Sequence, residues 1–218
     1  MTGNDGGKAY ILLSTGGLDV GAAHTGYKEI TDVADTTIWG QFGGVRTGHD
    51  LARMGDWDGD GLGDLVVGSV GYDDGGGEWS GRSYLFSGAD LTTGGDLQVS
   101  SALIAFDSIS AEGRLGYSNW GDFDVDGDGL PDLLIGGHSA EYGGMAYLFR
   151  GSSMTTGLYS VGNADARFVT NDSDDSNGKS VTSPGDVNGD GYDDILVSAY
   201  TDGDAATRAG RVCLYLTP

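Results

Sequence analysis

The sequence has little of what several large classes of protein need. Cys213 is the only cysteine in 218 residues, so no disulfide can form within the chain. No apolar stretch approaches the roughly 20 residues of a membrane helix, and Met1 leads directly into polar sequence without a signal peptide. We therefore expect no membrane insertion. The chain is either cytoplasmic or a piece of a larger secreted protein, and the features below favour the second.

Basic residues are also scarce. Eleven lysines and arginines stand against 33 acidic residues, which gives a formal net charge of −22. Nucleic acids and anionic membrane surfaces need a cationic face, so neither is an expected partner. The acids are clustered along the chain rather than spread evenly, and this clustering favours bound cations.

Proline is rare and glycine abundant, with 3 and 42 residues, and no window shows a sustained helical apolar period. The glycines follow no three-residue period, which excludes a collagen-like chain. Short runs of Val, Ile, Leu, Tyr and Phe recur between them. This pattern predicts many short strands joined by tight turns, because glycine adopts positive φ without steric cost.

The chain contains an internal repeat. Segments 55–68, 123–136 and 185–198 align, and their first aspartates are Asp56, then Asp124 after 68 residues and Asp186 after a further 62. A second apolar run follows each segment. These runs, and a fourth copy near the start of the chain, cover residues 82–88, 145–151, 211–216 and 8–13. The N-terminus therefore enters in the middle of a repeat.

Each repeat is expected to form four strands, one before the aspartate segment, one after it, then the second apolar run and a later strand. Four-stranded units repeating every 60–70 residues predict an all-β fold of β-propeller blades with four antiparallel strands each. The chain holds about three blades and a part-blade. The expected units are a trailing half-blade, two full blades and a blade without its last strand, at residues 1–39, 40–110, 111–175 and 176–218.

The aspartate segments have the spacing of a loop that binds a hard cation. Acidic or amide side chains at positions 1, 3, 5 and 9 converge on one point, and the backbone carbonyl at position 7 adds an oxygen. Calcium takes 6–8 oxygen ligands, so we predict three Ca²⁺ sites. The predicted ligands are Asp56, Asp58, Asp60, Leu62 and Asp64; Asp124, Asp126, Asp128, Leu130 and Asp132; and Asp186, Asn188, Asp190, Tyr192 and Asp194.

Other interpretations of these loops fit less well. An EF-hand needs a bidentate Glu at position 12, where Val67, Ile135 and Val197 stand. Magnesium demands stricter octahedral geometry, and zinc prefers His or Cys, which the loops lack. Solvated Asp-Gly turns remain an alternative, but three clusters of carboxylates would repel strongly without a cation.

The repeat resembles FG-GAP repeats, the blades of integrin-α-type propellers. The closest match combines Asn177-Gly-Lys-Ser180 with residues 185–198 and 210–215, and the middle repeat matches with two extra residues before its loop. The resemblance covers roughly residues 40–218. It implies a calcium-binding blade and a role in extracellular or cell-surface adhesion. Members of the family usually carry seven blades, whereas this chain has three acidic loops.

No constellation typical of an enzyme is present. The sequence has no Gly-x-Ser-x-Gly elbow and no Cys–His pair. His24, His49 and His138 share no spacing typical of a metal or catalytic pair, so ordinary roles are expected for them. The aspartates leave glycosidase chemistry open as an alternative, but a catalytic pair is needed once, not three times. We expect a protein that is not an enzyme.

Two functional classes remain, an extracellular recognition module with a protein or glycan ligand, and a structural, self-assembling scaffold. The last blade lacks a fourth strand, and Thr37–Trp39 near the N-terminus could supply one to a second copy. We therefore expect a homo-oligomer, in the simplest case a dimer that completes a ring of blades. The alternative is a fragment of a longer propeller.

Overall fold

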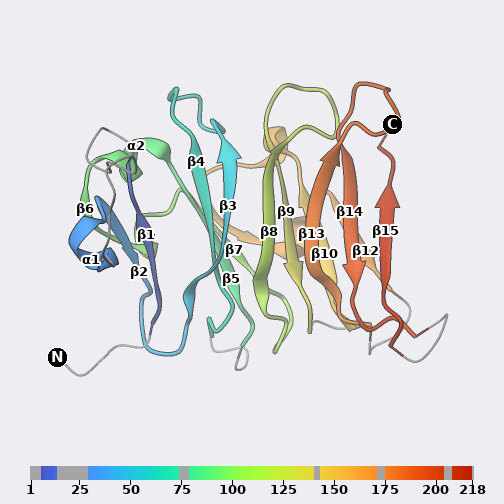
Figure 1. Cartoon of the computed structure of the whole chain (residues 1–218), viewed down its shortest axis with the longest axis horizontal. Helices are drawn as coiled ribbons and strands as arrows, with labels where there is room; N and C mark the ends of the chain where they lie inside the picture. Colours follow the sequence, from blue (N-terminus) through green and yellow to red (C-terminus); the bar gives the residue numbers. More distant parts are fainter. Residues whose placement is uncertain are drawn as a thin grey trace, which may run out of the picture.

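The computed structural model describes residues 6–13, 29–73, 79–139, 143–170, 175–203 and 208–217. Residues 1–5 and 14–28 of the expected N-terminal half-blade lie outside this part. The described chain forms four sheets that lie side by side in sequence order (Figure 1). The predicted all-β fold of propeller blades is confirmed. No helix among the described residues is both long enough and apolar enough to cross a membrane.

The first sheet has three strands in the order β1-β2-β6. β1 (Lys8–Ile11) and β2 (Thr36–Trp39) pair antiparallel, with Lys8 opposite Trp39. The short helix α1 (Ile30–Val33) precedes β2. β6 (Gly95–Gln98) comes from the following repeat and pairs with β2 in parallel.

The second sheet has five strands in the order β11-β7-β5-β4-β3. Four of them pair antiparallel in the order in which they occur along the chain: β3 (Thr47–Gly55), β4 (Asp64–Ser69), β5 (Arg82–Phe86) and β7 (Ile104–Asp107). The fifth, β11 (Gly157–Ser160), arrives from the next repeat and pairs with β7 in parallel.

The third and fourth sheets repeat this plan. The third has the order β12-β10-β9-β8, and it consists of β8 (Leu115–Phe123), β9 (Asp132–Gly137), β10 (Met145–Phe149) and β12 (Ala166–Val169). The fourth consists of β13 (Asn177–Gly185), β14 (Asp194–Ala199) and β15 (Arg211–Tyr215).

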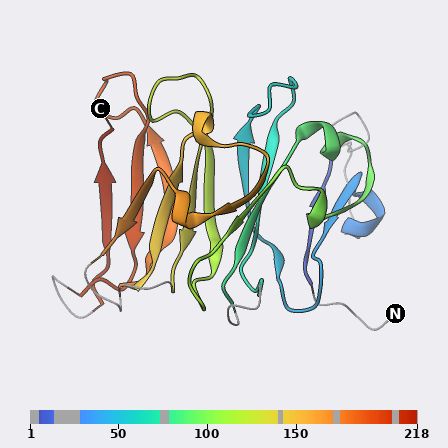
Figure 2. The same cartoon turned by 180° about the vertical axis from the view of Figure 1, so that it is seen from behind.

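The parallel strands β6 and β11 were not predicted from the sequence. Each lies in the connection between the third and fourth strands of a repeat, beside α2 (Gly88–Thr92) and η1 (Val99–Ser101) or between η3 (Gly151–Ser153) and η4 (Val161–Asn163). Figure 2 shows the second of these connections crossing from the third sheet to the second. Neighbouring sheets are therefore joined by backbone hydrogen bonds as well as by side chains.

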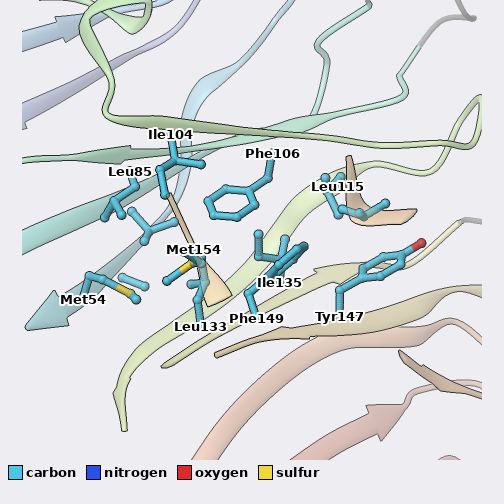
Figure 3. Packing of buried hydrophobic residues seen from close by; sticks show 13 residues of the cluster. Met54, Leu85, Ile104, Phe106, Leu115, Leu133, Ile135, Tyr147, Phe149 and Met154 are labelled. Atoms are coloured by element: carbon cyan, nitrogen blue, oxygen red, sulfur yellow. The ribbon is translucent and has the colours of Figure 1, made fainter. Parts of the chain in front are cut away.

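The hydrophobic core lies between successive sheets. The largest cluster joins the second and third sheets, where Leu85 and Ile104 face Leu133, Ile135 and Phe149 (Figure 3). Similar clusters hold the first sheet to the second and the third to the fourth. Each sheet is thus covered on one or both faces by its neighbours, which accounts for the nearly continuous burial of inner strands such as β4, β5 and β9.

The three aspartate segments occupy the same end of the molecule. They connect β3 to β4, β8 to β9 and β13 to β14, and they lie at the upper edge of Figure 1. We call this edge the loop end. The beginnings of β3, β8 and β13 lie at the opposite end.

Candidate metal centre

The first carboxylate of each loop holds the sixth residue. The backbone N–H of Gly61 donates to Asp56 at 3.0 Å, that of Gly129 to Asp124 at 2.9 Å, and that of Gly191 to Asp186 at 2.9 Å. The chain between them is therefore drawn into a tight turn around the carboxylate. The three copies agree closely.

The third and fifth side chains each accept a hydrogen bond from the N–H two residues later. At position 3 these bonds measure 3.1, 3.2 and 3.0 Å, and they end on Asp58, Asp126 and Asn188. At position 5 they measure 2.7, 2.8 and 3.0 Å, and they end on Asp60, Asp128 and Asp190. These donors fix the side chains in place before any ion arrives.

The glycines of the loops adopt a backbone that other residues rarely take. At position 6, φ is +85° for Gly61, +82° for Gly129 and +96° for Gly191. A Cβ added at any of the three would meet no atom within 4 Å. The requirement for glycine is therefore conformational and not a matter of space.

The ninth residue connects the loop to the end of the third strand of its blade. Asp64, Asp132 and Asp194 are buried, with exposures of 3%, 0% and 0%. One oxygen of each accepts the N–H of the second loop residue, and the other accepts a more distant N–H. Those bonds are Gly88 to Asp64 at 2.8 Å, Gly151 to Asp132 at 2.7 Å and Thr217 to Asp194 at 3.0 Å.

Two groups of carboxylates come close enough to hold one ion. Asp56, Asp58 and Asp64 each offer an oxygen within 4.8 Å of the others. In the second loop the same holds for Asp124, Asp126 and Asp128. These acidic clusters are compatible with a divalent cation, because their donors are hard oxygens with the spacing of one coordination shell.

Not every predicted ligand lies in these two groups. Asp60 accepts hydrogen bonds from Ser87 Oγ at 3.0 Å and from the Ala89 N–H at 3.2 Å, which tie the first loop to α2. Asp132 is occupied by the backbone donors described above.

The third loop is held by its own hydrogen bonds. The Asn188 amide donates to Asp190 at 2.7 Å, and Asp186 accepts the N–H groups of Gly189 at 2.6 Å and of Asp190 at 3.2 Å. The arrangement of its backbone is nevertheless that of the other two loops.

The seventh residues pack the loops against their surroundings. Their N–H groups donate to the fifth side chains, which fixes the peptide planes of Leu62, Leu130 and Tyr192. The Cβ of Leu62 would lie 2.6 Å from a side chain built at Gly88, and that of Leu130 2.8 Å from one at Gly151. A glycine after the third strand therefore lets the loop approach.

The buried carboxyls are poised to respond to a cation. Burial raises the pKa of Asp64 above its usual value and that of Asp132 to about 6, against the effect of the backbone donors. At the exposed Asp186 the N–H of Gly191 is the main cause of a lowered pKa. A bound cation would favour the ionised form of all three.

The second and third loops are in direct contact. The N–H of Asp124 donates to the Asp193 carboxylate, and the N–H of Asp193 donates to the Asp124 carbonyl. The first loop is linked less directly, through an ion pair of 2.9 Å between Arg53 and Asp122. A cavity of about 360 Å³ lies between the three and is lined by Asp56, Asp122, Asp124 and Asp193 among others. Sequence reasoning missed Asp193, because its partner is 69 residues away.

Comparison with known families gives the same repeat. The FG-GAP repeat model matches residues 180–215, and the FG-GAP-like repeat model matches residues 124–197. The chain is an FG-GAP repeat protein of the integrin-α-like family. These matches include the whole of the second and third acidic loops, whose geometry the first loop shares.

Two curated relatives of this FG-GAP repeat protein extend the comparison. Integrin alpha-PS2 of Drosophila melanogaster is 30% identical over 172 residues, or 77% of this chain. Phosphatidylinositol-glycan-specific phospholipase D of Mus musculus is 36% identical over 120 residues, or 52% of this chain. The chain spans only 11% and 13% of the lengths of these two proteins.

Proposed function

We propose that the chain is a calcium-binding, non-catalytic propeller module that serves recognition or adhesion outside the cell or at its surface. The observation that carries this proposal is the common hydrogen-bond frame of the three loops, with its glycines at positive φ, together with the three carboxylates that lie close to one another in each of the first two loops. Calcium accepts 6–8 oxygens in flexible geometry, which suits such loops.

Each chain would bind three Ca²⁺ ions. The side chains at positions 1, 3, 5 and 9 and the carbonyl at position 7 supply the oxygens, with water completing the shell. In the first loop Asp60 would exchange its hydrogen bonds to α2 for the ion. In the third loop a rotation of the Asn188 amide would replace its N–H group by its oxygen.

Calcium titration tests the metal sites. We expect binding with a Kd of about 10⁻⁴–10⁻³ M and a melting temperature that rises with calcium and falls with chelator, because the ion binds the folded chain. Asp126→Ala should weaken binding. Asp96→Asn, which removes an exposed carboxylate paired with Trp39, should leave it unchanged. A melting curve indifferent to calcium and chelator would overturn the proposal.

The absence of catalysis is part of the proposal. It is supported by the recurrence of one loop frame in three blades, since metal ligands recur with a repeat whereas a catalytic centre does not. The similarity to the mouse phospholipase D makes hydrolysis the alternative. Turnover of a phosphatidylinositol-glycan or of aryl glycosides by the calcium-loaded chain would contradict a non-catalytic module.

The similarity to integrin alpha-PS2 favours recognition of a protein or glycan over a purely structural scaffold. A glycan array with the calcium-loaded chain separates the two. Signals confined to a chemical class of glycan would support recognition, and an array without signals, together with no protein ligand in a cell-surface binding assay, would favour a scaffold.

We also propose that two copies associate through the outer face of the fourth sheet. Val212 and Leu214 on β15 are 66% and 48% exposed. In the second and third sheets the residues at the same place in the repeat, Ser83, Leu85, Ala146 and Leu148, are buried by the next sheet. Nothing in the described part of the chain covers the face of β15, which has the character of a surface between blades.

The contact would be made between faces of sheets. The strand expected to pass to a second copy, Thr37–Trp39, is part of β2, which already lies between β1 and β6 of its own sheet. The matching surface of the second copy is the outer face of its first sheet, with Lys8, Tyr10 and Trp39. Tyr10 has the same place in the repeat as Tyr84 and Tyr147, which are buried between sheets.

Light scattering in millimolar calcium tests this assembly. We expect twice the chain mass of 22.4 kDa. Leu214→Asp on the outer face should give the monomer, whereas Leu158→Asp, which changes a still more exposed leucine on β11, should not. A well-folded species at the mass of one chain would refute the dimer.

A further inference from the structure

Two arginines meet one tryptophan at the end opposite the acidic loops. The guanidinium carbon of Arg46 lies 4.0 Å from the centroid of the Trp79 ring, and that of Arg114 lies 5.7 Å from it. Arg46 precedes β3 and Arg114 precedes β8, at the same place in successive repeats. The two positive charges therefore converge where the second and third sheets meet.

Neither arginine has a carboxylate partner among the described residues. The ion pairs of this part of the chain involve Arg53, Arg82, Arg150 and Arg211. The Nε of Arg114 is buried and has no hydrogen-bond acceptor. In a chain with 33 acidic residues and 11 basic ones, two neighbouring guanidiniums without a carboxylate partner in the described part of the chain form an unusual site.

A histidine lies beside this pair. His138 Nε2 lies 3.3 Å from a terminal nitrogen of Arg114, and its Nδ1 lies 3.0 Å from Ser139 Oγ. Burial, followed by the charges of Arg114 and Lys179, lowers the pKa of His138 to about 4. The imidazole is therefore neutral at neutral pH and can accept a hydrogen bond from Arg114.

A row of rings continues from the arginines. The ring centroids of His49 and Tyr117 are 4.6 Å apart, and those of Tyr117 and His138 are 4.2 Å apart. Arg46 and His49 are exposed, while Trp79, Arg114, Tyr117 and His138 are half-buried. We call these six residues the cationic–aromatic cluster. Its exposed members, Arg46 and His49, present a guanidinium group and a ring to solvent.

The backbone of the cluster is held in an uncommon conformation. Arg46, Trp79 and Arg114 have φ values of +55°, +66° and +49°, which residues with side chains adopt rarely. Such conformations persist where the surrounding structure enforces them, and they concentrate at binding sites. Here they turn three large side chains toward one another.

We propose that the cationic–aromatic cluster binds a carboxylate-bearing sugar of a glycan. The guanidinium groups of Arg46 and Arg114 can bind a carboxylate, and the aromatic rings of the cluster offer a sugar ring an apolar face to lie on. The net charge of −22 disfavours long polyanions, so the ligand carries one or a few acidic groups. This inference rests on the proposed recognition function and names its ligand class.

Methyl β-glucuronide is a suitable probe, with methyl β-glucoside as its uncharged counterpart. In an NMR titration of the calcium-loaded chain, the glucuronide should shift the ring signals of His49, His138 and Trp79, and the glucoside should not. Arg46→Gln and Arg114→Gln should each weaken binding at least about tenfold, because each removes charge-assisted hydrogen bonds. Arg167→Gln, which changes an exposed arginine on β12, is the matched control.

Several results would overturn this inference. They are an equal response to the glucoside, undiminished binding in Arg46→Gln and Arg114→Gln, or tighter binding of an acetylated glutamyl amide, which would mark a peptide site. Arg46→Lys keeps the positive charge but lacks the planar guanidinium. It is the conservative variant to use if Arg46→Gln fails to fold. Absence of glucuronide binding in the folded, calcium-loaded chain defeats this inference alone, whereas absence of calcium binding defeats the proposed metal function alone.

Discussion

Asp124 and Asp193 hold two acidic loops together by a reciprocal pair of hydrogen bonds. The N–H of Asp124 donates to the Asp193 carboxylate at 3.0 Å, and the N–H of Asp193 donates to the Asp124 carbonyl at 2.9 Å. Asp124 is the first predicted ligand of the second loop, and Asp193 lies beside the ninth residue of the third. We therefore expect a change in either loop to affect the other.

Asp193→Ala should weaken calcium binding at the second loop although it removes no predicted ligand. The loss should be roughly 2- to 10-fold, because a hydrogen bond contributes about 0.5–1.5 kcal/mol net. Isothermal titration of the variant against the wild type measures it. Asp122→Ala, which breaks the ion pair with Arg53 on the other side of the loop, serves for comparison. Unchanged affinity in Asp193→Ala would show that the loops bind independently.

Substitutions of Asp132 and Asp126 should distinguish a structural carboxylate from a calcium ligand. Asp132→Asn places an amide N–H against the buried N–H of Val125 or Gly151 and should lower the free energy of unfolding by about 1–3 kcal/mol, even without metal. Asp126 is partly exposed, so Asp126→Asn should lower calcium affinity and change the free energy of unfolding of the metal-free chain little. Denaturation in chelator and calcium titration together decide between them.

Gly129→Val should be costly for a conformational reason. The position has a φ of +82° and open space around a built Cβ, so the penalty comes from the backbone and should exceed about 1–2 kcal/mol for a β-branched residue. Gly63→Val occupies equally open space in the first loop without a left-handed φ, and it should be tolerated. Equal melting temperatures for the two variants would contradict this explanation.

His138 should make the chain less stable in acid. Its pKa is lowered to about 4 in the folded chain from an ordinary value of 6.5, mainly by burial and then by Arg114 and Lys179. Between these values the unfolded chain binds the proton and the folded chain does not, so stability falls as pH decreases from about 6.5 to about 4. His138→Asn should reduce that slope, measured by denaturation at several pH values, and NMR titration reports the pKa itself.

The sequence predicted features that arise within a single repeat. The strand before and after each loop follows from local apolar runs, and the loop from the fixed spacing that begins at Asp56, Asp124 and Asp186. The strands β6 and β11 escaped prediction because their side chains are largely exposed and their partners are backbone groups of the preceding sheet.

The two candidate sites also differ in whether their residues lie within one repeat. The predicted loop ligands are neighbours in the chain, whereas the cationic–aromatic cluster assembles residues from four separate segments. The sequence alone predicts ordinary roles for His49 and His138. The equivalent places of Arg46 and Arg114 in the repeat were the available signal. Their convergence on Trp79 depends on turns that no local pattern reveals.

The crossing strand β11 has a mechanical consequence. It leaves the third sheet, hydrogen bonds to β7 of the second along Gly157–Ser160, and returns to β12. A force that pulls the two sheets apart must therefore strip these hydrogen bonds as well as separate the apolar contact between Phe106 and Phe149. The force therefore acts on β11, which is hydrogen bonded to the second sheet and continuous in the chain with the third. Under force, the second and third sheets should unfold together instead of one after the other.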